Sequence, residues 1–382
     1  MRVLHVTLSA AHGGRRDAIL TLTDQLRRLG VECGLVALRN LPSELAEVAG
    51  QVDYCEGLEI AGRPTLRELA EVYRLCRTRR VDLIHAHDAA SQYVASVLRI
   101  GAPSLRAVMT FHRTLGIESA GFRNRLRNAL SLPLIHRVLT ATEERRRFFL
   151  AETTIPAERV QVIPLGVDLT TFHPEPGARR ALREELGLSP DTVLSLAIGH
   201  SGSEKGLDQV VAGFARAAEC LGDKPWHLAL LGGGAPARLA ALHQLAREQL
   251  GDRVTFVGFR TDVPRWLQGA DLLVHAPRLE AFGLVAVQAM ATGVPVLGTA
   301  VGGLPEVIGD EAGGRLVPAG DLAALANGIV ALISDEEARA RLGRAALRRA
   351  REQFDAARSA ERHFSLYQEL LSRRVSGAGA VA

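Results

Sequence analysis

Short apolar runs alternate with longer amphipathic stretches along almost the whole chain, and this alternation restricts the fold more than any other feature. The first unit reads as a strand over 3–8, a helix over about 16–29 and a second strand over 31–38. This rhythm is typical of parallel sheets with helices on both faces. Further strands are expected at 81–86, 104–110, 137–141 and 160–163.

The alternation is interrupted once, by the proline- and glycine-rich segment Pro164–Gly177, and then begins again. Beyond it, strands are expected at 192–198, 227–231, 254–257, 272–275 and 294–297, and helices at 205–219, 237–250 and through much of 323–371. The sequence therefore predicts an α/β protein with two doubly wound, Rossmann-like domains. We expect domains over 1–165 and 166–355, with 356–382 forming a helix that packs back on the first domain and a frayed tail.

Composition excludes several classes of protein. The first 165 residues carry 23 arginines and 17 acidic residues, a balance of 23 − 17 = +6 against +4 for the whole chain. This excess is too small and diffuse for a nucleic-acid-binding protein, but it would suit a phospholipid surface or a phosphorylated acceptor. No apolar run approaches the ~20 residues of a membrane-spanning helix. Four scattered cysteines and the lack of a recognisable export signal predict a cytoplasmic location.

The segment Ile198–Leu207 is the most informative part of the chain. An expected strand ends in a turn rich in glycine and serine, and a helix is expected to begin near Lys205. Free backbone N–H groups, the positive helix end and an ammonium group would then lie together, which suits a diphosphate. The spacing of a P-loop is absent. A solvated lysine in an ordinary turn is the alternative, but only Lys205 and Lys224 are lysines among the 46 basic residues.

A second segment, Ala276–Gly298, has a related arrangement. Phe282–Leu284 should begin a helix after the strand expected at 272–275, so that its N–H groups face the same cleft. Glu280 lies in the preceding loop, and Gln288 lies about two turns further on.

These two segments belong to a series of short motifs along almost the whole chain. The motifs are Gly13-Gly14, Thr110-Phe-His112, Ile163-Pro-Leu-Gly-Val-Asp168 with Phe172, Glu204-Lys-Gly206, Glu280-x-Phe-Gly-Leu284, Gly293-x-Pro295 and Gly302-Gly-Leu-Pro-Glu306. Each motif is weak alone, but their order and spacing are specific. Together they resemble the retaining glycosyltransferases of family 4. These enzymes have the GT-B fold, in which two Rossmann-like domains face each other across a cleft.

The resemblance implies three catalytic residues. His112 would lie near the donor sugar, Lys205 would neutralise the diphosphate leaving group, and Glu280 would hold the hydroxyls of the transferred sugar. It also implies a larger set of donor-binding residues, several of them through backbone. These are Gly13, Gly14, His200, Lys205, Gly206, Phe259, Arg260, Glu280, Phe282, Gly283, Leu284 and Gln288.

Three positions depart from the family pattern. His200 replaces the usual arginine, Gln288 replaces the second glutamate and Leu165 replaces the asparagine of the Ile-Pro-Asn-Gly-Val-Asp run. Arginine offers phosphate a permanent charge and a planar fork, which histidine lacks. Glutamine loses a charge-assisted hydrogen bond, on the order of 1 kcal/mol. We therefore expect a donor site that is weaker or differently tuned.

The reaction implied by the resemblance is retaining transfer from a nucleotide-diphosphate sugar to a glycan, lipid-linked or small-molecule acceptor, as in cell-envelope polysaccharide synthesis. The chain contains no Asp-x-Asp pair and no convincing paired carboxylates. We therefore expect front-face transfer with neither a metal nor a cofactor, in which Lys205 stabilises the departing diphosphate. A nucleotide-sugar epimerase of the same fold and a catalytically weak sugar-binding subunit are the alternatives.

Two further patterns leave alternatives open. His85-x-His87 could be a metal-binding pair, but a strand end before Asp88 explains it equally well and no third ligand is indicated. Phe122–Leu130 has apolar residues at helical spacing among arginines. It is either a peripheral contact with the inner face of the membrane or with a lipid-linked acceptor, or an ordinary packed helix with a solvated basic side.

Overall fold

The computed structural model describes residues 1–39, 42–60, 64–112 and 128–377. The chain forms two compact units: unit 1 contains Met1–Gly166 and Ala356–Ala382, and unit 2 contains Val167–Asp355. The chain therefore passes from one unit to the other twice, and the first crossing lies one residue after the expected boundary. Most of the basic segment 122–130, and the tail from 378, fall outside the described residues.

Unit 1 is built on a parallel sheet with the strand order β3-β2-β1-β4-β5-β6-β7. The direction of strand addition reverses between β1 and β4, and ligands of doubly wound sheets bind at the carboxyl ends of the strands at such a switch point. The strands are β1 Arg2–Thr7, β2 Glu32–Ala37, β3 Tyr54–Gly57, β4 Leu83–Ala86, β5 Arg106–Phe111, β6 Arg137–Thr140 and β7 Val160–Val162. The main helices are α1 Gly14–Arg28, α2 Pro42–Ala49, α3 Leu66–Thr78, α4 Ala89–Gly101, α6 Glu143–Glu152 and α15 Ala356–Gly377.

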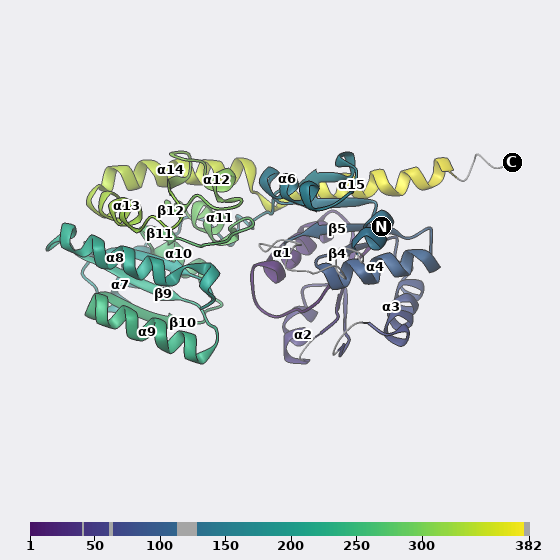
Figure 1. Ribbon diagram of the computed structural model, residues 1–382, viewed down its shortest axis with the longest axis horizontal. Coiled ribbons are helices and arrows are strands. Elements are labelled where there is room, and N and C mark those ends of the chain that lie inside the picture. Colours follow the sequence, from purple (N-terminus) through teal and green to yellow (C-terminus); the bar gives the residue numbers. More distant parts are fainter. Residues whose placement is uncertain (40–41, 61–63, 113–127, 378–382) are drawn as a thin grey trace. The chain divides into compact units, whose positions relative to one another are not determined.

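One face of this sheet is covered by α1 and by α15, the yellow C-terminal helix of Figure 1. Leu22 and Leu26 of α1 and Leu366 and Tyr367 of α15 join Val3 of β1 in one apolar cluster. Helix α15 thus packs on unit 1 although all of unit 2 precedes it in the chain. Because side chains alternate along a strand, His5 lies on the same covered face as Val3.

Unit 2 repeats the architecture with the strand order β10-β9-β8-β11-β12-β13, which reverses between β8 and β11. The strands are β8 Val193–Ile198, β9 Trp226–Leu231, β10 Val254–Gly258, β11 Leu272–His275, β12 Val296–Thr299 and β13 Gly314–Val317. The helices are α7 Ala178–Leu186, α8 Leu207–Leu221, α9 Pro236–Leu250, α10 Val263–Gly269, α11 Leu284–Ala291, α12 Leu304–Ile308, α13 Leu322–Ser334 and α14 Glu336–Gln353.

Three sequence expectations need correction. Strands β3 and β13 are not among the expected strands; both lie at sheet edges, where a weak apolar pattern suffices. Helix α8 begins at Leu207, because Gly206 adopts a left-handed conformation after the short 3-10 turn Ser203–Lys205. The helical stretch at 323–371 is divided into α13, α14 and α15. No helix within the described ranges is long and apolar enough to cross a bilayer.

Candidate functional site

The loops that follow β8 and β11 pack tightly together at the switch point of unit 2. A Cβ atom on Gly206 would lie 2.0 Å from the carbonyl oxygen of Ala276, so only glycine fits there. The backbone N–H of Arg278 donates to the carbonyl of Glu204 at 2.8 Å, and its guanidinium donates to both oxygens of Asp208 at 2.6–2.7 Å. These contacts fix the turn that ends at Lys205 against the loop that contains Glu280.

Lys205 and Glu280 form an ion pair at this point. The lysine Nζ donates to Oε2 of Glu280 at 2.9 Å, and the two side chains are 24% and 10% exposed. Nε2 of His275 lies 3.4 Å from the same oxygen, and the backbone N–H of Ala281 donates to Oε1 at 3.1 Å. Burial raises the pKa of Glu280, but the contact with His275 and the charge of Lys205 together outweigh burial and hold the pKa well below its usual range. Glu280 is therefore an ionised hydrogen-bond acceptor at neutral pH.

The N-terminus of α11 follows directly. Gly283 is the N-cap with a φ of +89°, and it has no side chain with which to cap the helix. The cap residue thus leaves the first N–H groups of α11 without a side-chain acceptor of its own, beside the positive end of the helix. Phe282 is buried and packs edge-on against Phe354, so it can offer a ligand only its backbone. Gln288 lies partly exposed one turn after Leu284 on the same helix.

The other residues predicted to bind the donor in unit 2 are engaged locally. Nδ1 of His200 accepts the N–H of Gly202 at 3.1 Å, and its Nε2 lies 3.2 Å from Oε1 of Glu204. Arg260 forms two hydrogen bonds of 2.7 Å with Asp262. Phe259 is 56% exposed.

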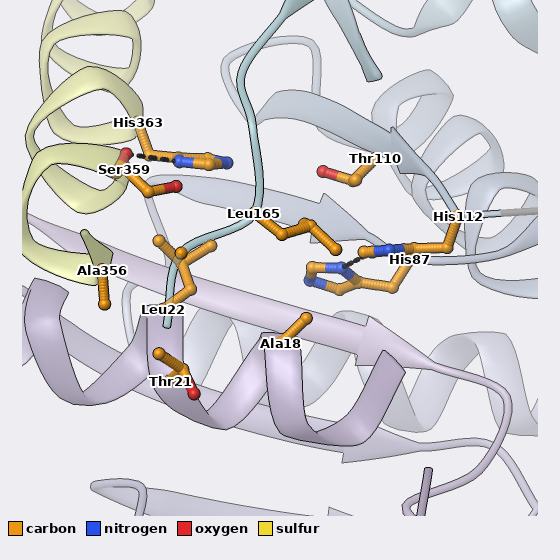
Figure 2. A pocket seen from close by; sticks show the side chains of 11 residues that line it. Ala18, Thr21, Leu22, His87, Thr110, His112, Leu165, Ala356, Ser359 and His363 are labelled. Carbon is orange, nitrogen blue, oxygen red and sulfur yellow. Dashed lines mark hydrogen bonds between the residues drawn. The ribbon is translucent and has the colours of Figure 1, made fainter. Parts of the chain in front are cut away.

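A pocket in unit 1 lies at the corresponding position of its own sheet (Figure 2). Its wall combines side chains of α1 and α15, the ends of β4 and β5, and residues 165–166. His87, His112 and Leu165 lie next to one another in this wall. Its other polar side chains are Thr21, Thr110, Ser359 and His363. Nearby, α1 begins at Gly14 after Gly13, whose φ of +146° and open surroundings leave the backbone accessible.

Five histidines gather on this face of unit 1. Nδ1 of His5 lies 3.0 Å from Nε2 of His87, and Nδ1 of His87 lies 3.1 Å from Nε2 of His112; we call these three residues the histidine chain. His85 instead hydrogen-bonds to the hydroxyl groups of Tyr367 at 2.6 Å and Thr110 at 2.7 Å. His363, on α15, hydrogen-bonds to the carbonyl of Ser359 at 2.8 Å.

The sequence indicates His85 and His87 as a pair without a third ligand, whereas the structure places His5 beside them. One ring nitrogen from each of the three lies within 4.8 Å of the other two, a spacing compatible with a metal ion. Sequence reasoning missed His5, and also His275 beside Glu280. A signal for both was available, because each lies at the carboxyl half of a strand that borders a switch point.

Burial keeps these histidines uncharged. It lowers the pKa of His5 to about 3 and that of His363 to about 4, and it lowers the pKa values of His85 and His87 well below their ordinary value. Desolvation, with a smaller effect of the positive charge of Arg15, lowers the pKa of His112 to about 3. The polar wall of the unit 1 pocket is therefore neutral at physiological pH.

Two family models match the chain in succession. The model described as Glycosyltransferase Family 4 matches residues 13–171, and the model described as Glycosyl transferases group 1 matches residues 178–349. The chain belongs to the group 1/family 4 glycosyltransferases. The resemblance of its motifs to that family is thus confirmed.

The names of curated relatives of this chain give different substrates. The D-inositol 3-phosphate glycosyltransferase of Xylanimonas cellulosilytica is 38% identical over 57% of this chain, a match that spans only 53% of that relative. The N-acetyl-alpha-D-glucosaminyl L-malate synthase of Bacillus anthracis is 28% identical over 80% of this chain and 78% of its own length.

Solved structures establish the fold of this glycosyltransferase. HepE from Anabaena, crystallised in complex with UDP, superposes with a TM-score of 0.85 over 97% of this chain and 100% of its own, at 22% identity. The predicted GT-B fold is confirmed. Gly13, Gly14 and His112 lie in unit 1, whereas Lys205, Gly206, Glu280 and the start of α11 come together in unit 2. Their individual roles remain predictions.

Proposed function

We propose that this chain transfers a sugar, with retention of anomeric configuration, from a nucleotide-diphosphate sugar to a hydroxyl group of a glycan, lipid-linked or small-molecule acceptor. The observation that carries the proposal is the Lys205–Glu280 ion pair beside the uncapped N-terminus of α11. The HepE structures, which contain UDP or UDP-glucose, support the same class of donor.

The ammonium group of Lys205 and the N–H groups of α11 suit the diphosphate. Charge that builds up on the leaving group is stabilised most effectively by fixed positive groups in a partly buried site. Both features are part of the protein itself, so they offer positive charge without a divalent cation. We therefore propose metal-independent transfer.

Glu280 suits the hydroxyl groups of the transferred sugar. As an ionised carboxylate it accepts hydrogen bonds and has no proton to give, so it is unsuited to act as a general acid. It is also a poor candidate nucleophile, because Lys205 and the N–H of Ala281 already hold its two oxygens. This favours front-face transfer, in which the departing diphosphate takes the proton of the acceptor.

The two lysines of the chain give a matched test. Lys205→Met removes the charge from the proposed site, whereas Lys224→Met removes an exposed lysine elsewhere in unit 2. Binding is measured as thermal stabilisation by UDP, GDP and ADP and their sugars. Donor hydrolysis without acceptor is then followed with and without EDTA. Loss of both signals in Lys205→Met alone supports the proposal, and equal behaviour of the two variants contradicts it.

The same assay separates the two rival functions. An epimerase would convert the donor into an epimer that remains attached to the nucleotide. A sugar-binding subunit would show thermal stabilisation but no turnover with any acceptor. Retention is tested on the first transfer product by the anomeric proton coupling in its NMR spectrum, and inversion of configuration would refute the front-face mechanism.

A further inference from the structure

The histidine chain couples the protonation pattern of His112 to a residue buried inside the sheet. A neutral imidazole has one N–H group and one bare nitrogen. Both nitrogens of His87 are engaged, one by His5 and one by His112. Since His87 has a single proton to donate, its two hydrogen bonds must run in the same direction along the chain.

The buried end favours one direction. Nε2 of His5 has no hydrogen-bond partner among the residues that the structure describes, and His5 is fully buried. If the protons ran from His112 toward His5, this Nε2 would carry a buried N–H group without an acceptor among the described residues, which leaves the desolvation of that donor uncompensated. If the protons run from His5 toward His112, Nε2 of His5 is a bare nitrogen and no N–H group is left unpaired there. In this direction Nδ1 carries the proton in all three rings.

We propose that His5 and His87 are positioning residues that hold His112 as its Nδ1–H tautomer, so that His112 presents an N–H donor to a substrate oxygen. No hydrogen bond to Nδ1 of His112 is made by the part of the chain that the structure describes, and His112 lines the unit 1 pocket. The use of this donor rests on the proposed sugar transfer, whereas the tautomer does not.

A metal site made from the same residues fits the contacts less well. Both nitrogens of His85 are already bonded at 2.6–2.7 Å to Tyr367 and Thr110, and both nitrogens of His87 are also engaged. Only Nε2 of His5 is unoccupied among the ring nitrogens of these three residues. An ion would have to break several of the bonds that the structure contains.

The tautomers are measured by ¹⁵N NMR of the protein labelled at histidine, with His112 assigned by loss of its signals in His112→Gln. We expect Nδ1–H at His112, whereas neutral histidine in water favours Nε2–H. In His5→Phe, His112 should lose its Nδ1–H signal, while His5→Gln, which can still donate to His87, should retain it. His227→Phe replaces a buried histidine of unit 2 and should change nothing.

The kinetic consequence is a separate measurement. With the donor found in the nucleotide panel, His5→Phe should lower kcat/KM about tenfold, the cost expected for one hydrogen bond. The double variant His5→Phe/His112→Gln should have the same kcat/KM as His112→Gln alone, because His5 acts only through His112. An Nε2–H signal at His112 in the wild type, an unchanged tautomer in His5→Phe, or stoichiometric zinc binding that shifts these signals would each overturn the proposal. Lack of turnover in the wild type and in every variant would refute the proposed sugar transfer. The NMR result would then still decide whether His5 and His87 set the tautomer of His112.

Discussion

Replacement of His363 by glutamine should make unit 1 less sensitive to acid. The side chain is 3% exposed, and burial lowers its pKa to about 4 from the ordinary 6.5. As the pH falls below 6.5, His363 takes up a proton in the unfolded chain but not in the folded one. The contribution of His363 to the free energy of unfolding is therefore fully present above pH 6.5 and is lost progressively between pH 6.5 and about 4.

The size of the effect follows from the same numbers. One pKa unit corresponds to about 1.36 kcal/mol. The shifted pKa of His363 therefore lowers the free energy of unfolding of the wild type by about 2 kcal/mol at pH 5 relative to pH 8. Glutamine does not titrate, and its amide can still donate to the carbonyl of Ser359. The free energy of unfolding of the variant should thus rise by about 2 kcal/mol relative to wild type between pH 8 and pH 5.

The aromatic residues of the chain allow the two units to be followed separately in urea. All four tyrosines lie in unit 1, and both tryptophans lie in unit 2. Near-ultraviolet circular dichroism of tyrosine therefore reports on unit 1, and tryptophan fluorescence provides an internal control. His173→Gln, which replaces a partly exposed histidine of unit 2, is a second control. The reasoning is refuted if His363→Gln changes the free energy of unfolding by the same amount at both pH values.

Four further substitutions, one of them a control, test unit 2. A Cβ on Gly302 would lie 1.9 Å from the carbonyl oxygen of Glu280, so Gly302→Ala should cost about 1–3 kcal/mol in urea unfolding and reduce turnover. Gly320 also has a positive φ, but a Cβ there would meet nothing within 4 Å, so Gly320→Ala should retain activity. Gln288→Glu should tighten donor binding several-fold in calorimetric titration, and equal affinities would remove the predicted ribose contact. His200→Arg should raise donor affinity most at high pH, because arginine keeps its charge there; a ratio of affinities independent of pH would contradict this.

The paired residues of unit 2 are predictable because their local signals are strong. Lys205 and Glu280 each follow an apolar run that reads as a strand, and parallel strands bring their carboxyl ends to one edge of the sheet. The left-handed Gly206 is not predictable in this way. The steric demand that requires it comes from the carbonyl of Ala276, which is distant in sequence.

The place of His5 in its strand was a signal, but the contacts of the histidine chain could not be predicted, for a different reason. Its members lie 82 and 25 residues apart, on three different strands or strand ends. The period of each strand predicts which face a side chain occupies, but not which strands are neighbours. Only the observed order, with β1 beside β4 and His5 in register with His85, brings these rings together.

The position of α15 has a consequence for synthesis on the ribosome. Residues 1–166 emerge first, but the helix that covers their sheet emerges only after all of unit 2. At about 5–20 residues per second, the ~190 residues of unit 2 delay it by roughly 10–40 s. During that interval the apolar surface around Val3 and Leu83 lacks its cover, and the hydroxyl of Tyr367 is absent from His85. The first unit to be translated is therefore the last to be completed, and nascent chains should need protection from aggregation during this time.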